Sequence, residues 1–99
     1  MSKGRKDDAA KPDMVLLPPD ALVAVARVFT FGAAKYQDRT DNWARVDEGR
    51  DRYASALLRH FCAWRLGEQC DAETNESHLA HLAACALILL ARQTRGIDS

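Results

Sequence analysis

The fold is decided by residues 76–94, which read ESHLAHLAACALILLARQT. Apolar side chains recur there at helical spacing, and one face of the expected helix carries Leu79, Leu82, Ala86 and Leu90. A different face carries three potential metal or proton ligands at i, i+3 and i+7, namely His78, His81 and Cys85. Gly96 is typical of a helix end. The pattern predicts a helix over residues 76–94.

Two earlier segments also have helical periodicity. Residues 21–36 are apolar on most sides, and Pro19 and Asp20 supply helix-start chemistry just before them. We expect neighbours to cover such a helix on most of its faces. Residues 50–66 form the other helix, for which the sequence predicts a buried apolar face made of Tyr53, Ala56, Leu57, Phe61 and Trp64. A polar loop over residues 37–49 joins the two.

The whole chain therefore reads as all-α, a compact bundle of about three main helices. The sequence contains no alternating strand pattern, internal repeat or glycine-rich phosphate loop. A chain of 99 residues makes one domain and buries only about 65% of its unfolded surface. We expect residues 14–96 to form this domain, residues 1–13 to form a flexible or strap-like arm, and a homodimer or homotetramer to complete the core.

Charge and composition exclude several classes of protein. The 14 basic residues balance the 14 acidic ones, so no overall field favours stable nucleic-acid or membrane binding. The longest apolar run, residues 79–91, is well short of the roughly 20 residues of a membrane span. Three cysteines without a CxxC pair, and no signal-like start, indicate reduced thiols and a cytoplasmic protein.

Residues 67–81 concentrate the chemistry, because five potential ligands lie there: Glu68, Asp71, Glu73, His78 and His81. Carboxylate oxygens suit Mg²⁺ or Mn²⁺. Glu68 and Asp71 are spaced i, i+3, so on a helical turn both carboxylates would face one ion. The plain alternative is a solvated linker in which Asp71 or Thr74 caps the following helix.

The paired histidines have several possible roles. His78 and His81 could bind a metal, orient a carboxylate or donate to a phosphate. With Cys85 one turn later, a structural zinc site is conceivable. Two histidines at the start of a buried helix are as often core residues with satisfied hydrogen bonds, and the spacing alone leaves these readings open.

A second group of residues has the chemistry of a nucleotide pocket. It offers an ammonium group, two aromatic faces and an amide, from Lys35, Tyr36, Trp43 and Asn42. Arg59 and His60 add a possible phosphate clamp. The alternative is an exposed lysine beside aromatic gap-fillers, with an Arg59 that pairs with an acid across the bundle.

An ordered series of short motifs resembles one protein family. The series is Lys11-Pro12, Leu16-Leu17-Pro18, Phe31-Gly32-Ala33-Ala34-Lys35-Tyr36, Asn42-Trp43, Arg59-His60, Gly67-Glu68, Asp71, Glu73 and His78-Leu79-Ala80-His81. It is similar to the small phage and prophage dATP/dGTP diphosphohydrolases of the MazG-like all-α nucleotide pyrophosphohydrolase superfamily, one branch of which is called MazZ. The resemblance covers residues 8–92.

This resemblance implies hydrolysis of a purine deoxynucleoside triphosphate, dGTP or dATP, to the monophosphate and pyrophosphate. It implies two or three Mg²⁺ or Mn²⁺ ions, sites completed by a neighbouring subunit, and a role in adjusting the dNTP pool during phage infection. Glu68 and Asp71 stand at the family's Gly-Glu-x-x-Asp positions as metal ligands, with Glu73 and His78 as further candidates. The chain departs from the wider superfamily, because no ExxE motif precedes Glu68, and Cys85 stands where relatives often carry Asn.

Charge suggests how such a site would work. A triphosphate carries about four negative charges, which divalent ions must neutralise while they lower the pKa of an attacking water. On this reading the β and γ phosphates are held by Lys35 and Arg59, together with Lys11 from the arm. His81 or a carboxylate orients the water, Trp43 or Tyr36 stacks on the purine, and Asn42 reads its edge. The rival function is a non-catalytic helical interaction or regulatory module with zinc on His78, His81 and Cys85.

Overall fold

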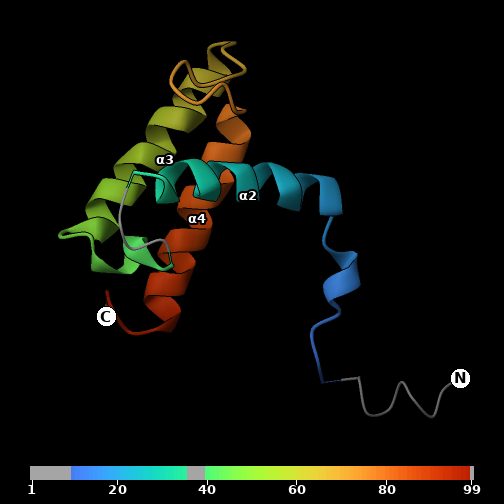
Figure 1. Cartoon of the computed structure of the whole chain (residues 1–99), viewed down its shortest axis with the longest axis vertical. Helices are drawn as coiled ribbons and strands as arrows, with labels where there is room; N and C mark the ends of the chain where they lie inside the picture. Colours follow the sequence, from blue (N-terminus) through green and yellow to red (C-terminus); the bar gives the residue numbers. More distant parts are fainter. Residues whose placement is uncertain (1–9, 36–39, 99) are drawn as a thin grey trace, which may run out of the picture.

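A computed structural model of the chain describes residues 10–35 and 40–98 (Figure 1). In chain order the elements are a short 3₁₀ helix η1 (Met14–Leu16), α2 (Pro19–Ala33), a second 3₁₀ helix η2 (Asn42–Arg45), α3 (Gly49–Arg65) and α4 (His78–Thr94). Helices α3 and α4 pack along each other, and α2 crosses α4 (Figure 1). The part of the chain that the structure describes contains no strand beyond one isolated bridge between Cys70 and Ser77. The predicted all-α fold with three main helices is confirmed.

The helix ends follow from local chemistry. Pro19 and Asp20 occupy the first turn of α2, as predicted. Ser77 caps α4 by accepting a hydrogen bond from the backbone N–H of Leu79 at 3.1 Å. The suggestion that Asp71 or Thr74 caps this helix is therefore wrong. The 3₁₀ helix η2 lies inside the segment expected to be a plain loop.

The core of the single chain is small and lies mainly under one face of α4. Its buried apolar residues are Ala33, Ala80, Ala84, Cys85 and Ile88. His78 and Arg92 are buried with them, each 4% exposed. Most of the polar stripe of α4 therefore faces inward, while Leu79 is 46% and Leu90 is 57% exposed.

Two expectations about burial are wrong within one chain. Helix α2 buries only Ala33, and Val23 on it is 55% exposed, so neighbours do not cover it on most sides. On α3, Phe61 and Trp64 are 39% and 40% exposed instead of buried. Both differences have one physical cause. Among the described elements α2 packs mainly on α4, and α3 packs mainly on α4 with a smaller contact to η2, so the other faces of both helices stay exposed. None of the described helices is long and apolar enough to cross a membrane.

Arg92 joins three parts of the fold near the C-terminal end of α4. Its guanidinium donates to both carboxylate oxygens of Asp98, at 2.7 and 2.9 Å. Nη1 also donates to the backbone carbonyl of Trp43 at 2.8 Å. The backbone of Gly49 lies so close that a Cβ there would overlap the guanidinium. Arg92 thus fixes η2 against α4 and the start of α3.

Candidate functional site

A cavity of about 270 Å³ lies among α2, α3, α4 and the two loops that precede α3 and α4. Aromatic and aliphatic side chains form much of its wall, among them Phe31, Trp43, Tyr53 and Ile88. Charged and polar side chains line the rest, namely Lys35, Asn42, His60, Asp71, Glu73, Thr74 and His81. The cavity therefore combines an apolar surface with cationic, anionic and imidazole groups.

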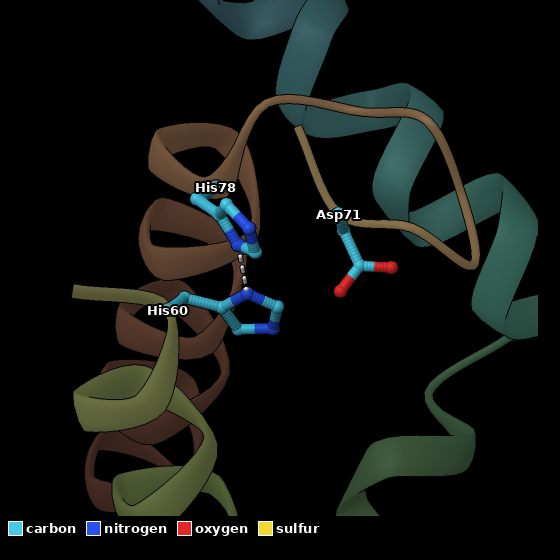
Figure 2. A group of neighbouring side chains, drawn as sticks. All are labelled: His60, Asp71 and His78. Carbon is cyan, nitrogen blue, oxygen red and sulfur yellow. Dashed lines mark hydrogen bonds between the residues drawn. The ribbon is translucent and has the colours of Figure 1, made fainter. Parts of the chain in front are cut away.

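Three side chains from different elements form a hydrogen-bonded chain beside this cavity. Glu68 Oε1 lies 2.6 Å from His78 Nε2, and His78 Nδ1 lies 2.8 Å from His60 Nδ1 (Figure 2). A carboxylate only accepts, so His78 donates through Nε2. With its proton on Nε2, His78 offers Nδ1 as the acceptor, and His60 donates its Nδ1–H to it. The contact orders α3 against the start of α4.

His81 stacks on the ring of His60, the last member of this chain. Its ring lies 4.4 Å from the ring of His60 with an interplanar angle of 11°. Its Nε2 is 2.6 Å from the hydroxyl of Thr74, which also accepts the backbone N–H of Glu76. Burial lowers the pKa of both His60 and His81 below the ordinary histidine value. The two rings are therefore neutral lone-pair donors at neutral pH.

Asp71 is held in the loop before α4 by backbone groups. Its Oδ1 accepts from the N–H of Glu73 at 2.8 Å and from the N–H of Thr74 at 3.1 Å. Burial pushes the pKa of Asp71 upward and these two hydrogen bonds push it downward, and the resulting pKa lies below the usual aspartate value. Asp71 is therefore an ionised carboxylate. Figure 2 shows its side chain beside those of His60 and His78.

The cationic group of the cavity is Lys35, in the turn that follows α2. Its Nζ lies 3.2 Å from Glu73 Oε2 and 5.1 Å from the centre of the Phe31 ring. Both partners of the ion pair are largely exposed, so the pair contributes little to stability. Because the pair is weak and exposed to solvent, an anionic ligand can displace Glu73 from Lys35 with little loss of free energy.

Trp43 and Asn42 are placed by η2. The guanidinium of Arg95 lies 4.9 Å from the Trp43 ring and pairs with Asp41 at 2.9 Å, which fixes the indole from one side. Asn42 Nδ2 is buried, and among the described residues it has no hydrogen-bond partner. An unpaired buried amide costs about 1 to 3 kcal/mol, so a ligand that accepts this hydrogen bond gains from it.

Most of the residues predicted from the sequence come together here. Seven of them line the cavity: Lys35, Asn42, Trp43, His60, Asp71, Glu73 and His81. His78 contacts His60, and Glu68 contacts His78. Arg59 does not line the cavity; it donates to Ser55 on its own helix at 2.9 Å and borders a separate hollow. Lys11 is exposed on the segment that leads away from the helices (Figure 1). Tyr36 lies outside the described residues.

The zinc set suggested by spacing is not assembled in this structure. Within the described ranges, one group of three metal-capable side chains converges, with ligand atoms within 4.8 Å of one another, and it consists of His60, Asp71 and His78. Cys85 is not in this group. Its thiol is buried, and burial raises its pKa above the ordinary value, so it is an unreactive thiol.

Several contacts of the site were missed from the sequence. Thr74 positions His81, Arg95 covers Trp43, and Arg92 holds the backbone that carries Trp43. A signal existed for Arg92, since a basic residue directly follows the apolar run of α4. Nothing in the spacing pointed to Thr74 or Arg95.

Comparison with known proteins gives one positive result. The family model described as dATP/dGTP diphosphohydrolase, N-terminal, matches residues 1–99. Comparisons with curated proteins and with solved structures found no match. Because the family model spans the whole chain, this protein belongs to the dATP/dGTP diphosphohydrolase N-terminal family.

Proposed function

We propose that this protein hydrolyses purine deoxynucleoside triphosphates, dGTP or dATP, to the monophosphate and pyrophosphate, with a divalent metal ion. The observation that carries the proposal is one cavity that combines an aromatic wall with Lys35, Asp71 and Glu73 on its polar side. An apolar slot suits a base, and a lysine beside carboxylates suits a metal-bound triphosphate. The membership of the family supports the same substrates.

The size of the cavity suggests how the substrate lies. About 270 Å³ is below the roughly 300 to 1,000 Å³ of pockets that enclose whole ligands. We therefore place the purine inside, against Trp43 and Phe31, and the phosphates across the polar rim. The buried Nδ2 of Asn42 would donate to an acceptor on the purine edge, such as N7.

The phosphate end combines opposite charges. Lys35 would leave Glu73 to hold the β and γ phosphates and to stabilise the departing pyrophosphate. The oxygen-rich acids fit Mg²⁺ or Mn²⁺, and a bound ion supplies charge neutralisation and a more acidic water. His81, fixed by Thr74, would orient the attacking water and accept its proton. This hydrolysis would consume purine dNTPs and so lower their pool in the cytoplasm, as expected during phage infection.

The direct test is turnover. Incubation with each of the four dNTPs and Mg²⁺ or Mn²⁺, followed by anion-exchange chromatography, is expected to yield monophosphate and pyrophosphate, fastest for dGTP or dATP. EDTA should abolish the products, because catalytic ions bound with substrate are removed more easily than structural zinc. Intact dNTPs in every reaction, together with stoichiometric tightly bound zinc, would instead favour the helical interaction module.

We also propose that the protein works as a homodimer or homotetramer. Large apolar side chains are exposed on α3 and α4 of the single chain, including Leu58, Trp64, Leu79, Leu87 and Leu90. Burial of these side chains against a second copy would remove this apolar surface from water.

Light scattering after size-exclusion chromatography is expected to give a multiple of 11.0 kDa. Leu90→Glu should shift the species toward the monomer, because it puts a charge on the exposed apolar face of α4. Gln93→Glu, at an exposed polar position of the same helix, is the matched control and should leave the mass unchanged. A monomeric parent protein at micromolar concentration would contradict the proposal.

A further inference from the structure

We infer that His60, His78 and Asp71 bind one first-row transition-metal ion through two imidazole nitrogens and a carboxylate, while Glu68 orients His78 from outside the coordination shell. The inference deepens the proposed function, on which it rests only for the placement of the ion beside the substrate phosphates. Binding of the ion itself requires no nucleotide, so it can be tested separately.

Geometry is the first support. The two Nδ1 atoms are 2.8 Å apart, and the ligand atoms of all three residues lie within 4.8 Å of one another (Figure 2). Two imidazole nitrogens that share one ion at about 2.1 Å are separated by about 3.0 to 3.4 Å. The rings therefore need to part by only a few tenths of an ångström to admit the ion.

The direct hydrogen bond between the two rings is the competing arrangement. Metal binding replaces it without any net change in protonation, because His60 moves its proton from Nδ1 to Nε2. Both Nδ1 lone pairs then face the ion. His78 needs no such change, since its proton is already on Nε2, where Glu68 accepts it at 2.6 Å.

The Glu68 contact is itself typical of a metal ligand. Histidines that bind metals almost always donate their second ring N–H to a carboxylate, carbonyl or water, which fixes the tautomer. His78 is 4% exposed, whereas the Glu68 side chain is 60% exposed and meets it from the solvent side. This geometry gives Glu68 an orienting role, in place of the direct ligation expected from its spacing with Asp71.

The position of the third ligand fits as well. Backbone N–H groups of Glu73 and Thr74 occupy Oδ1 of Asp71, which leaves Oδ2 available to an ion. This carboxylate beside the imidazoles of His60 and His78 completes a set of three donors.

The donor set determines the class of metal. Imidazole nitrogens suit Zn²⁺, Co²⁺, Ni²⁺ and Mn²⁺, whereas Mg²⁺ prefers oxygen ligands and retains its waters. Three protein ligands also leave coordination positions open, as in catalytic sites. His60 and Asp71 line the cavity, and His78 lies behind them, so the open positions would face the space assigned to the substrate.

The test is a titration of the chelator-stripped full chain with Co²⁺, followed by its visible absorption, and calorimetric titrations with Zn²⁺ and Mg²⁺. We expect one Co²⁺ per chain, with at least 100-fold weaker binding of Mg²⁺. His60→Phe, which keeps a ring stacked on His81, and Asp71→Asn should each weaken Co²⁺ binding at least 100-fold. Glu68→Gln should weaken it about 10- to 100-fold.

The control is Cys85→Ala, which removes a nearby soft ligand and should change the Co²⁺ affinity less than threefold. Circular dichroism confirms that each variant is folded. Absence of Co²⁺ binding, unchanged affinity in folded His60→Phe, or loss of binding in Cys85→Ala would each overturn the inference. Turnover of dNTPs with Mg²⁺ by a protein that does not bind Co²⁺ would reject this site and keep the hydrolase, whereas Co²⁺ binding without turnover would do the reverse.

Discussion

Asp71→Asn is expected to lower kcat/KM for dGTP and dATP at least about 1,000-fold, which corresponds to about 4 kcal/mol of transition-state stabilisation. The asparagine carbonyl can still accept the N–H groups of Glu73 and Thr74, so the loop before α4 keeps its shape. The variant loses the negative charge, and with it most of the attraction for a divalent ion beside the phosphates. A large loss of turnover with an unchanged fold therefore separates chemistry from structure.

The measurement is initial-rate kinetics at saturating Mn²⁺, with two comparison variants. Glu68→Gln is expected to lose only about 10- to 100-fold, because it orients His78 and does not itself meet the ion. Glu76→Gln on the same loop disrupts the partly exposed pair with Arg27 and removes one of several charges that act on His81, so its rate should stay within about twofold. If Glu68→Gln is more damaging than Asp71→Asn, Glu68 is a direct ligand, as its spacing with Asp71 suggested.

Helix positions were predictable because they depend on local chemistry. The segments expected over residues 21–36, 50–66 and 76–94 are observed as Pro19–Ala33, Gly49–Arg65 and His78–Thr94. Periodicity, the proline at the start of α2 and the glycine after α4 all act within a few residues of the helix ends. The short helix η2 was missed because its backbone is held by Arg92, which lies far along the chain.

The choice of the buried helix face was not predictable in the same way. The leucine-rich face of α4 was expected to form the core. In the structure the buried face is instead the one that carries His78, Cys85 and Arg92. In the part of one chain that the structure describes, α2, α3 and the short η2 pack on α4, and they lie against its polar stripe. An apolar helix face predicts that this face becomes buried. It does not specify whether the covering surface belongs to the same chain or to another copy.

The site was predictable as a set of residues and not as a set of contacts. Seven predicted residues line one cavity. They could be predicted as a group because the family resemblance singles out motifs that lie far apart in the sequence. The direct contact between His60 and His78 depends on how α3 packs along α4, and neither helix contains that information alone. The same is true of the Thr74 contact with His81, because a loop conformation creates it.

Arg92→Lys is expected to lower the free energy of unfolding by about 2 to 3 kcal/mol, although it keeps the charge. Arg92 uses three nitrogens at once, two on Asp98 and one on the carbonyl of Trp43. A single ammonium group cannot reproduce this fork, so one carboxylate oxygen or the carbonyl loses its partner. In a domain of this size the loss lowers the melting temperature by about 10 °C or more.

Thermal and urea unfolding measure the effect, and Gly49 provides an independent approach to the same guanidinium. Gly49→Ala places a methyl group against the Arg92 side chain and should destabilise the fold, although alanine is the better helix former. Gly32→Ala, inside α2, meets no atom within 4 Å and should stabilise the fold by about 0.5 to 1 kcal/mol.

Arg27→Lys, in the partly exposed pair with Glu76, should change the stability by less than about 0.5 kcal/mol. Equal stabilities of the Arg92→Lys and Arg27→Lys proteins would mean that the contacts of Arg92 do not hold η2 in place. Because η2 carries Trp43 and Asn42, a destabilised Arg92→Lys protein should also bind purine substrates more weakly below its melting temperature, with a higher KM.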